Sequence, residues 1–221
     1  MLLKNKMMVG LAALALAGGT TVLAMPAANA ATMKCGARCV TLASEKFGAS
    51  DVVAVGSSSA GELTAFWYNS GEDFFGQPEG TVRDFSKAGV ISGSLAKTYG
   101  SDQIYQYVYA PDGHVTDECL GTSAGSTAVT LQSCGASPNT LWVVLSGWAH
   151  GNFEPVLSAQ LSAQSAMLLT ASAAKGALTV TQMNLSTSTA NGVTTSTVSP
   201  NQMWETVCGV YGNSTVSNIF G

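Results

Sequence analysis

The feature that most constrains the fold of this chain is a six-residue phrase that occurs twice. Residues 137–142 read Ser-Pro-Asn-Thr-Leu-Trp, and residues 199–204 read Ser-Pro-Asn-Gln-Met-Trp. A weaker third copy lies at residues 101–105 and ends at Tyr105. A recurring polar-polar-x-aromatic step indicates an internal repeat, and a repeat decides which architectures are open to a chain. Three copies predict a three-lobed, all-β module.

The N-terminus has the pattern of an export signal. Two lysines precede an apolar core at Met7–Leu16, which is too short to span a bilayer, and Ala28-Asn29-Ala30 is a small-x-small cleavage pattern. We expect residues 1–30 to be a signal peptide and residues 31–221 to form a single secreted domain. No later stretch has the apolar length of a membrane span, so we expect no membrane span in the mature chain.

The charge balance disfavours two classes of partner. The signal peptide carries two of the nine Lys and Arg residues and none of the thirteen acids, so the mature chain has 7 − 13 = −6 net charges. Nucleic acids and anionic membranes both require a basic face. We therefore expect no nucleic-acid partner.

Five cysteines in an exported chain predict disulfides. Cys119 and Cys134 flank one run of strand and turn, and we expect them to pair. Two arrangements remain open for the others: Cys208 joins Cys35 or Cys39 and ties the termini together, or Cys35 pairs with Cys39. A zinc site is not favoured, because the Cys35-x3-Cys39 pair has no nearby histidine.

Alternating apolar and polar residues predict short strands separated by turns. The clearest runs are Ile104–Tyr109, Ala128–Cys134 and Ala177–Leu185, and the last two match each other in pattern. No segment after residue 30 shows a helical period. Val82–Leu95 is interpreted as two short strands around glycines, and Gly71–Gly80 as an irregular loop. Many short strands with frequent turns are typical of an all-β sandwich or barrel.

The spacing of the aromatic steps predicts the lobes. Tyr105 and Trp142 are 37 residues apart, whereas Trp142 and Trp204 are 62 apart. We place the surplus of the last lobe in two insertions, Ser146–Glu154 and Ser186–Ser199. The predicted lobes are residues 36–104, 105–144 and 145–208. In this interpretation Val156-Leu157 corresponds to Cys119-Leu120 of the preceding lobe.

The motifs in the second half of the chain resemble those of the ricin-type (QxW) β-trefoil lectins. The resemblance rests on Cys119-Leu120-Gly121, Leu131–Cys134, Asn139–Trp142 and Asn201–Trp204, and it covers residues 103–145 well and 156–206 fairly. The Val-Thr-Leu-Gln-x-Cys-Gly run is also similar to that of small secreted actinobacterial proteins. The resemblance implies a β-trefoil of three four-stranded lobes and a non-catalytic module that binds carbohydrate.

The chain departs from the family at the acid that accepts hydrogen bonds from the sugar hydroxyls. Family members that bind sugar carry an Asp directly after the Cys-Leu step, where this chain has Gly121 and, after Val156-Leu157, Ser158. Three interpretations therefore stay open, the third being a degenerate lectin whose single surviving site lies in the first lobe. The first is a glycan-binding module, and the second is a trefoil scaffold for protein contact, such as an inhibitor or a surface interaction protein. The expected partner is an extracellular glycan or protein.

The insertion between the second and third lobes contains the best candidate ligand site. It brings two aromatics together with a histidine and an amide beside a glycine, which is how a loop reads a glycan or peptide. The alternative is that the aromatics cover one end of the barrel. The polar residues of the closing phrases are further candidates, although they can equally fix the turns. The candidate ligand-binding residues are Trp148, His150, Asn152, Phe153, Asn139, Asn201 and Gln202.

The sequence gives no support to catalysis. Its two histidines, His114 and His150, lie in no nucleophile or metal motif. The acids between residues 72 and 84 match no calcium loop and are interpreted as a solvated acidic segment. We therefore expect no enzyme activity, no metal and no cofactor.

Overall fold

The computed structural model describes residues 39–56, 59–65, 72–111 and 113–208. The predicted signal peptide and Cys35 lie outside these ranges.

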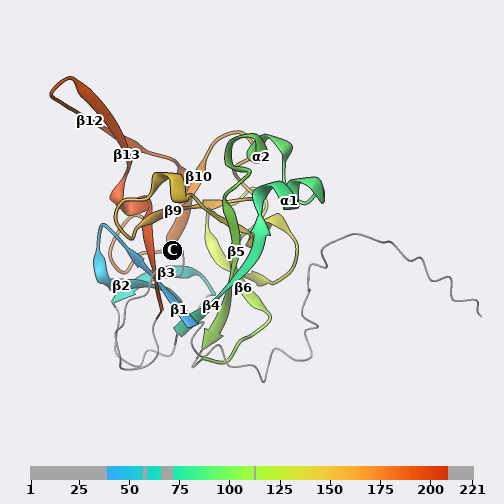
Figure 1. The fold of residues 1–221 in the computed structure, drawn as a ribbon. Coiled ribbons are helices and arrows are strands. Elements are labelled where there is room, and N and C mark those ends of the chain that lie inside the picture. The colour runs from blue at the N-terminus through green and yellow to red at the C-terminus, as the bar shows by residue number, and fades with distance from the viewer. Residues whose placement is uncertain (1–38, 57–58, 66–71, 112, 209–221) are drawn as a thin grey trace, which may run out of the picture.

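Six strands form a closed barrel (Figure 1). Each is antiparallel to the next around the ring, and the last strand returns to the first. Closure removes the free edges that an open sheet would leave. In ring order the barrel strands are β1 (Cys39–Ser44), β4 (Glu72–Thr81), β5 (Gln103–Pro111), β8 (Trp142–Val144), β9 (Glu154–Ser158) and β14 (Met203–Cys208).

Each of the three lobes has one hairpin inserted between its two barrel strands. The hairpins are β2–β3 (Gly48–Val55, Gly61–Ala65), β6–β7 (Glu118–Thr122, Val129–Ser133) and β10–β11 (Met167–Ala171, Leu178–Gln182). Neighbouring hairpins touch each other through two isolated bridges, Ala60–Thr130 and Ala128–Thr179. A six-stranded barrel with three mutually contacting hairpins is a β-trefoil, so the predicted fold class is confirmed.

The hairpins meet on an approximate three-fold axis. Gly61, Val129 and Leu178 are each the first residue of the second hairpin strand, and they lie against one another. A Cβ atom on Gly61 would lie 3.0 Å from Cγ1 of Val129 and 3.5 Å from Cδ1 of Leu178. The glycine thus makes room for two larger side chains in the same layer.

The strand register corrects the predicted position of the first-lobe aromatic. In each lobe, one large aromatic of the closing strand pairs with its own opening strand and with the opening strand of the next lobe. In the first lobe, Phe74 pairs with Val40 of its own lobe and with Tyr109 of the next. In the second lobe, Trp142 pairs with Tyr105 and with Ser158 of the third lobe. In the third lobe, Trp204 pairs with Glu154 and with Ser44 of the first lobe. The first-lobe counterpart of the two tryptophans is therefore Phe74. Tyr105 lies in the opening strand of the second lobe.

Both tryptophans are fixed by the same hydrogen bond. The indole Nε1 of Trp142 donates to the carbonyl of Leu120 at 2.8 Å, and that of Trp204 donates to the carbonyl of Leu169 at 2.9 Å. Leu120 lies in β6 and Leu169 in β10. The counterpart of Cys119-Leu120 is therefore the strand 167–171, and the predicted match with Val156-Leu157, which lie in barrel strand β9, was wrong.

Two short helices replace the two strands predicted over residues 82–95. Helix α1 (Val82–Lys87) begins with a capping box between Thr81 and Asp84, and α2 (Gly93–Tyr99) has Ser92 as its N-cap. Their apolar side chains pack on the outer face of the barrel, in a cluster that includes Phe85, Leu95, Ile104, Val143 and Leu157. The segment predicted as an irregular loop, residues 71–80, was also misjudged, because Glu72–Thr81 is barrel strand β4.

The predicted disulfide between Cys119 and Cys134 is confirmed, with an S–S distance of 2.01 Å. It joins the start of β6 to the end of the β6–β7 hairpin. Cys39 is also disulfide-bonded, to a cysteine whose side chain lies outside the described residues.

A fourth hairpin extends away from the body of the domain (Figure 1). Strands β12 (Leu185–Ala190) and β13 (Val193–Val198) form a separate two-stranded sheet. Asn191 and Gly192 both have positive φ, at 51° and 76°, which is the type I′ turn that the sequence Asn-Gly favours. This hairpin occupies the Ser/Thr-rich insertion predicted over residues 186–199.

Candidate functional site

The segment between β8 and β9 forms a short ordered loop. It starts with the 3₁₀ helix η4 (Ser146–Trp148) and continues into a tight turn. His150 and Phe153 exchange both backbone hydrogen bonds, at 2.9 and 3.1 Å, across Gly151, which has φ of 62°. Glycine accepts this left-handed conformation at no steric cost, so the turn is built into the sequence. We refer to residues 146–153 as the insertion loop.

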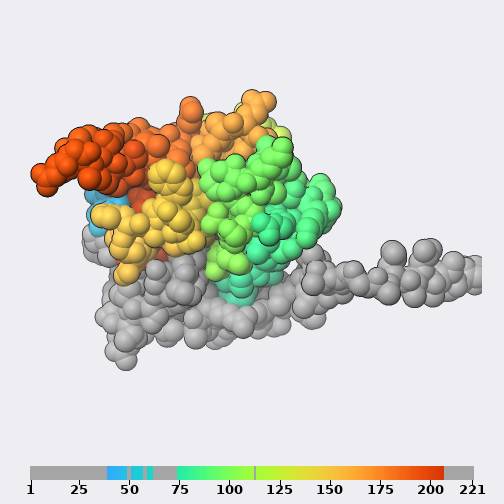
Figure 2. All heavy atoms as spheres, turned by 45° about the horizontal axis from the view of Figure 1, so that its top comes forward, coloured from blue at the N-terminus to red at the C-terminus, as the bar shows by residue number. Residues whose placement is uncertain are grey.

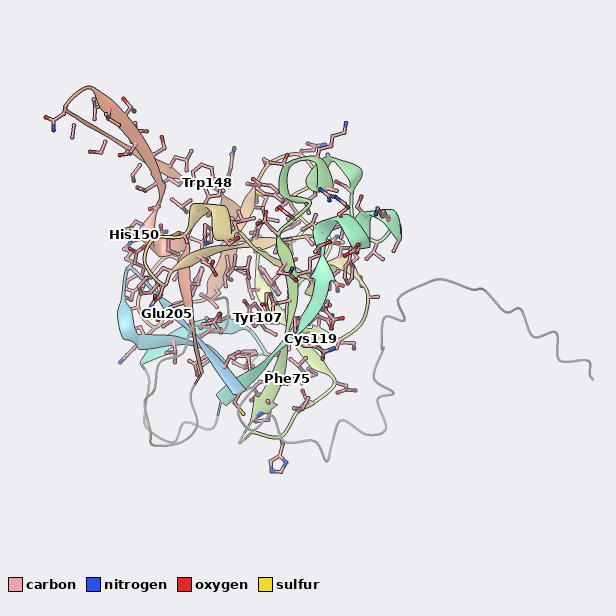
Figure 3. All side chains as sticks on the ribbon, in the orientation of Figure 1. Phe75, Tyr107, Cys119, Trp148, His150 and Glu205 are labelled. Atoms are coloured by element: carbon pink, nitrogen blue, oxygen red, sulfur yellow. A yellow bond between two sulfur atoms is a disulfide. The ribbon has the colours of Figure 1, made fainter. Side chains whose placement is uncertain are left out.

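Two side chains attach the insertion loop to the barrel, and Figure 3 labels one member of each pair, His150 and Glu205. Nδ1 of His150 lies 2.6 Å from Oε1 of Glu45, just after β1, and the amide nitrogen of Asn152 donates to Oε1 of Glu205 in β14 at 3.1 Å. The imidazole remains 71% exposed, whereas the Glu45 side chain is 19% exposed. The loop therefore places polar groups on the surface in fixed positions.

Trp148 and Phe153 of the insertion loop have different environments. Trp148 is 37% exposed, and it is the one exposed large aromatic among the described residues. Phe153 is half-buried and packs against the outer core cluster. Of the four predicted loop residues, Trp148, His150 and Asn152 thus reach the surface, while Phe153 anchors the loop.

Two carboxylates near the loop were not predicted. Glu154 opens β9, is 5% exposed, and has an Oε2 atom that is buried without a hydrogen-bond partner. Burial, and secondarily the negative charge of Asp102, raises the pKa of Glu154 to about 7. Burial also raises the pKa of Asp102, against the opposing effect of a hydrogen bond with Ser146 of the insertion loop. The available sequence signal was an acid at the start of an otherwise apolar strand.

The polar residues of the closing phrases lie in two equivalent 3₁₀ turns, η3 (Pro138–Thr140) and η5 (Pro200–Gln202). Asn139 and Asn201 are half-buried, and the Oδ1 atom of Asn139 is buried without a hydrogen-bond partner. Neither asparagine belongs to the insertion loop, so we leave both out of the candidate site.

Gln202 is buried, and both ends of its amide are occupied. Its nitrogen donates to Oγ1 of Thr170 at 3.2 Å, to Oγ1 of Thr181 at 2.9 Å and to the carbonyl of Gln182 at 2.9 Å. Its oxygen accepts from the backbone of Asn184 at 2.8 Å. Gln202 therefore fixes the turn, which is the alternative the sequence left open for it, and has no surface to offer a ligand.

The trefoil register shows what stands at the position of the family acid. The residue after the leucine that receives the indole hydrogen bond is Gly121 in the second lobe and Thr170 in the third. In the first lobe the hairpin register places Ala54 there. Ser158, which the sequence had placed at this position, is a buried barrel residue whose hydroxyl contacts that of Thr122 at 3.4 Å. None of the three equivalent positions carries an acid.

Placing the aspartate of the ricin-type lectins at residue 121 is expected to destabilise the fold. A Cβ atom on Gly121 would lie 2.5 Å from the backbone oxygen of Asn139, which is below any normal contact, so the η3 turn must move. We expect Gly121→Asp to lower the free energy of unfolding by about 2 kcal/mol or more in urea denaturation. Gly135→Ala is the control, because a Cβ atom there meets nothing within 4 Å. Equal stability of the two variants would contradict the close approach.

The described residues contain no group of three or more His, Cys, Asp or Glu side chains placed to hold a metal ion. None of their helices is long and apolar enough to cross a membrane.

Comparison with known proteins gives matches to solved structures. No family model and no curated protein matches the chain. The designed three-fold symmetric protein ThreeFoil is 14% identical, with a TM-score of 0.45, over 76% of this chain and 97% of its own. A mosquitocidal holotoxin is 14% identical (TM-score 0.48, 78% of this chain), and the hemolytic lectin CEL-III is 17% identical (0.39, 74%).

This chain spans only 17% of that holotoxin and 28% of CEL-III. At these identities and scores the matches carry no functional argument. The class of protein is instead defined by the closed barrel and three hairpins described above: the chain is a β-trefoil.

Proposed function

We propose that this chain is a secreted, non-catalytic binding module that holds a glycan at the insertion loop, residues 146–153. The observation that carries the proposal is the exposed indole of Trp148 on a loop whose polar side chains are fixed to the barrel. A rigid aromatic surface beside oriented hydrogen-bonding groups provides binding area at a low cost in conformational entropy.

The chemistry of the loop suits a sugar. The indole face can stack on the C–H groups of a pyranose ring, as aromatic surfaces do with apolar faces. Glu45 and Glu205 each use one oxygen to bond a loop side chain. A carboxylate has about four acceptor sites, so Glu45, whose side chain is 19% exposed, can also receive hydrogen bonds from sugar hydroxyls. Glu205 is buried and holds Asn152 in place. In this proposal Glu45 does the work of the aspartate that is absent from the three hairpin positions.

Export is part of the same proposal. The lysine-rich start, the short apolar core and the Ala28-Asn29-Ala30 step support a signal peptide. The Cys119–Cys134 disulfide is consistent with an oxidising compartment.

The test is a glycan array probed with oxidised residues 31–221 and with the Trp148→Ala variant. We expect a reproducible hit whose affinity falls by about fivefold or more in the variant, since an aromatic anchor at a binding site typically contributes about 1 kcal/mol or more. Val193→Ala removes an apolar side chain on the distant hairpin that is even more exposed, 62% against 37% for Trp148, and should bind like the wild type. A hit that Trp148→Ala retains would place the site elsewhere in the molecule.

One observation favours the alternative, a trefoil that contacts a protein and has no sugar site. The three hairpin positions that would carry the family acid hold Ala54, Gly121 and Thr170, and Gly121 is sterically closed to any side chain. If thermal melting shows that the protein is folded and the array is still blank, the glycan proposal is rejected for the sugars displayed. The same insertion loop would then be tested for a protein partner.

A further inference from the structure

We propose that the β12–β13 hairpin is a dimerisation arm that pairs, strand edge to strand edge, with the same hairpin of a second copy of this chain. The hairpin is six residue pairs long, from Leu185–Val198 to Ala190–Val193, and among the described residues no other strand pairs with it. Figure 2 shows it projecting beyond the body of the molecule. This inference is independent of the glycan proposal.

An isolated hairpin of this kind lacks the packing that ordinarily holds one together. Every residue of 185–197 is exposed, including Leu185 and Val193, which is 62% exposed. Two strands alone are marginally stable in water, and a third strand or a packed face is needed for independent stability. The cross-strand contact between the hydroxyls of Thr189 and Thr194, at 3.1 Å, is the kind of side-chain ladder that a further strand would continue.

The edges of the hairpin lack the usual protection against pairing. Exposed edges are normally blocked by charges, proline or a bulge. Residues 176–204 contain no Lys, Arg, Asp or Glu, and neither β12 nor β13 contains a proline. The six pairs run in unbroken register, without a bulge.

The absence of charge selects a second copy as the occupant. The mature chain has seven Lys and Arg residues against thirteen acids, a net charge of −6, so two copies repel each other over most of their surfaces. The arm offers a charged partner no ion pair, yet it adds no repulsion between identical molecules. Its Ser and Thr side chains are similar on both strands, so an antiparallel two-fold contact matches like with like.

The ladder rule identifies the backbone groups available to the second copy. In a two-residue hairpin the pair next to the turn, Ala190–Val193, is hydrogen-bonded, and bonded and non-bonded pairs then alternate. The outward-facing N–H and C=O groups are therefore those of Thr187 and Thr189 on one edge and Thr194 and Ser196 on the other. A two-fold contact uses one of these edges in both copies.

Two kinds of variant separate this arm from the rest of the fold. Deleting Thr187–Ala190 together with Val193–Ser196 removes four residue pairs and keeps the Asn-Gly turn, with Ser186 and Thr197 beside it. The base of the hairpin remains, where the backbone N–H of Ser199 donates to the carbonyl of Asn184 at 2.9 Å. Thr187→Pro and Ser196→Pro each remove one outward N–H without breaking a bond inside the hairpin. Ser196→Ala is the matched control, because it keeps that N–H.

The measurement is molar mass by sedimentation equilibrium from about 10 µM to about 1 mM, the range in which a small edge contact assembles. We expect the wild type and Ser196→Ala to approach twice the monomer mass. The shortened chain and one of the two proline variants should stay monomeric, with unchanged thermal melting. A monomeric wild type over this range would overturn the proposal, and so would a shortened chain that still dimerises.

Discussion

Replacing Glu154 by glutamine is expected to make the folded protein more stable at pH 8 by about 1–3 kcal/mol. Glu154 takes the third-lobe barrel position that Val40 and Tyr105 take in the first and second lobes. Its carboxylate is therefore enclosed by barrel side chains, and one of its oxygens has no hydrogen-bond partner. A neutral amide of the same shape removes the cost of the buried charge.

The effect depends on pH in a definite direction. The pKa of Glu154 is raised from its ordinary value of 4.5 to about 7, so between these pH values the folded state holds a proton that the unfolded state has released. The free energy of unfolding must then fall as the pH rises from about 4.5 to about 7 and level off above that. Asp102, whose pKa is also raised by burial, acts in the same direction.

Urea denaturation at pH 5, 6, 7 and 8 measures this dependence. The wild type should lose stability across the series, and Glu154→Gln should flatten most of the loss. At pH 5 the free energy of unfolding of the variant should equal that of the wild type or be slightly lower, because the amide brings unbonded N–H groups into the barrel. Glu118→Gln, at an exposed carboxylate, is the control. A variant that follows the wild-type curve would contradict the buried, high-pKa carboxylate.

The second large effect is expected at Trp204. We expect Trp204→Ala to lower the free energy of unfolding by about 3–5 kcal/mol, since the fully buried indole fills the barrel and its N–H satisfies the carbonyl of Leu169. Trp204→Phe should cost less, because a phenyl ring occupies the equivalent place at Phe74. Urea denaturation of the two variants measures both losses.

The matched control is Trp148→Ala, which should cost about 1 kcal/mol, well below the loss at Trp204, because Trp148 is 37% exposed whereas Trp204 is fully buried. If Trp148→Ala were as destabilising as Trp204→Ala, the insertion loop would be part of the core. The assignment of Trp148 to ligand binding would then fail.

Much of the architecture could be predicted from local pattern. The duplicated phrase identified Trp142 and Trp204 as equivalent, and the alternating runs at 128–134 and 177–185 correspond to β7 and β11. These signals survive because a strand with one buried face must alternate, in the hairpins as in the barrel. The Cys119–Cys134 pair followed from its position around one hairpin.

The first lobe was harder because its markers are chemically different. Phe74 replaces the closing tryptophan, so the motif matches Tyr105 instead, which lies one strand later. Helices α1 and α2 have six and seven residues, which is too short for a helical period to emerge. Their caps were visible in the sequence as Thr81-x-x-Asp84 and Ser92, and the type I′ turn was visible as Asn191-Gly192.

The candidate site was only partly accessible from sequence. The insertion loop stood out because it adds residues beyond the length of an ordinary trefoil lobe, and those residues include aromatic and polar side chains. Its partners Glu45 and Glu205 are 105 and 53 residues away from His150 and Asn152, so only the folded chain brings them together. The enclosure of Glu154 is likewise a property of the closed barrel rather than of any local motif.

These observations divide the aromatic residues by task. Trp142 and Trp204 hold the trefoil through buried rings and indole hydrogen bonds, while Trp148 lies exposed on an anchored loop. Function in this chain is thus proposed to lie in an insertion, while the repeated motif supplies stability.

The most direct test of this division is an NMR spectrum of the indole N–H groups after transfer to D₂O, repeated with the ligand found on the array. The account predicts that the Trp142 and Trp204 signals persist in D₂O and do not shift. Among these three tryptophans of the described residues, the Trp148 signal should exchange at once, and in water it should be the one that moves on ligand addition. Rapid exchange at Trp142 or Trp204, or a ligand shift there with Trp148 unmoved, would contradict it.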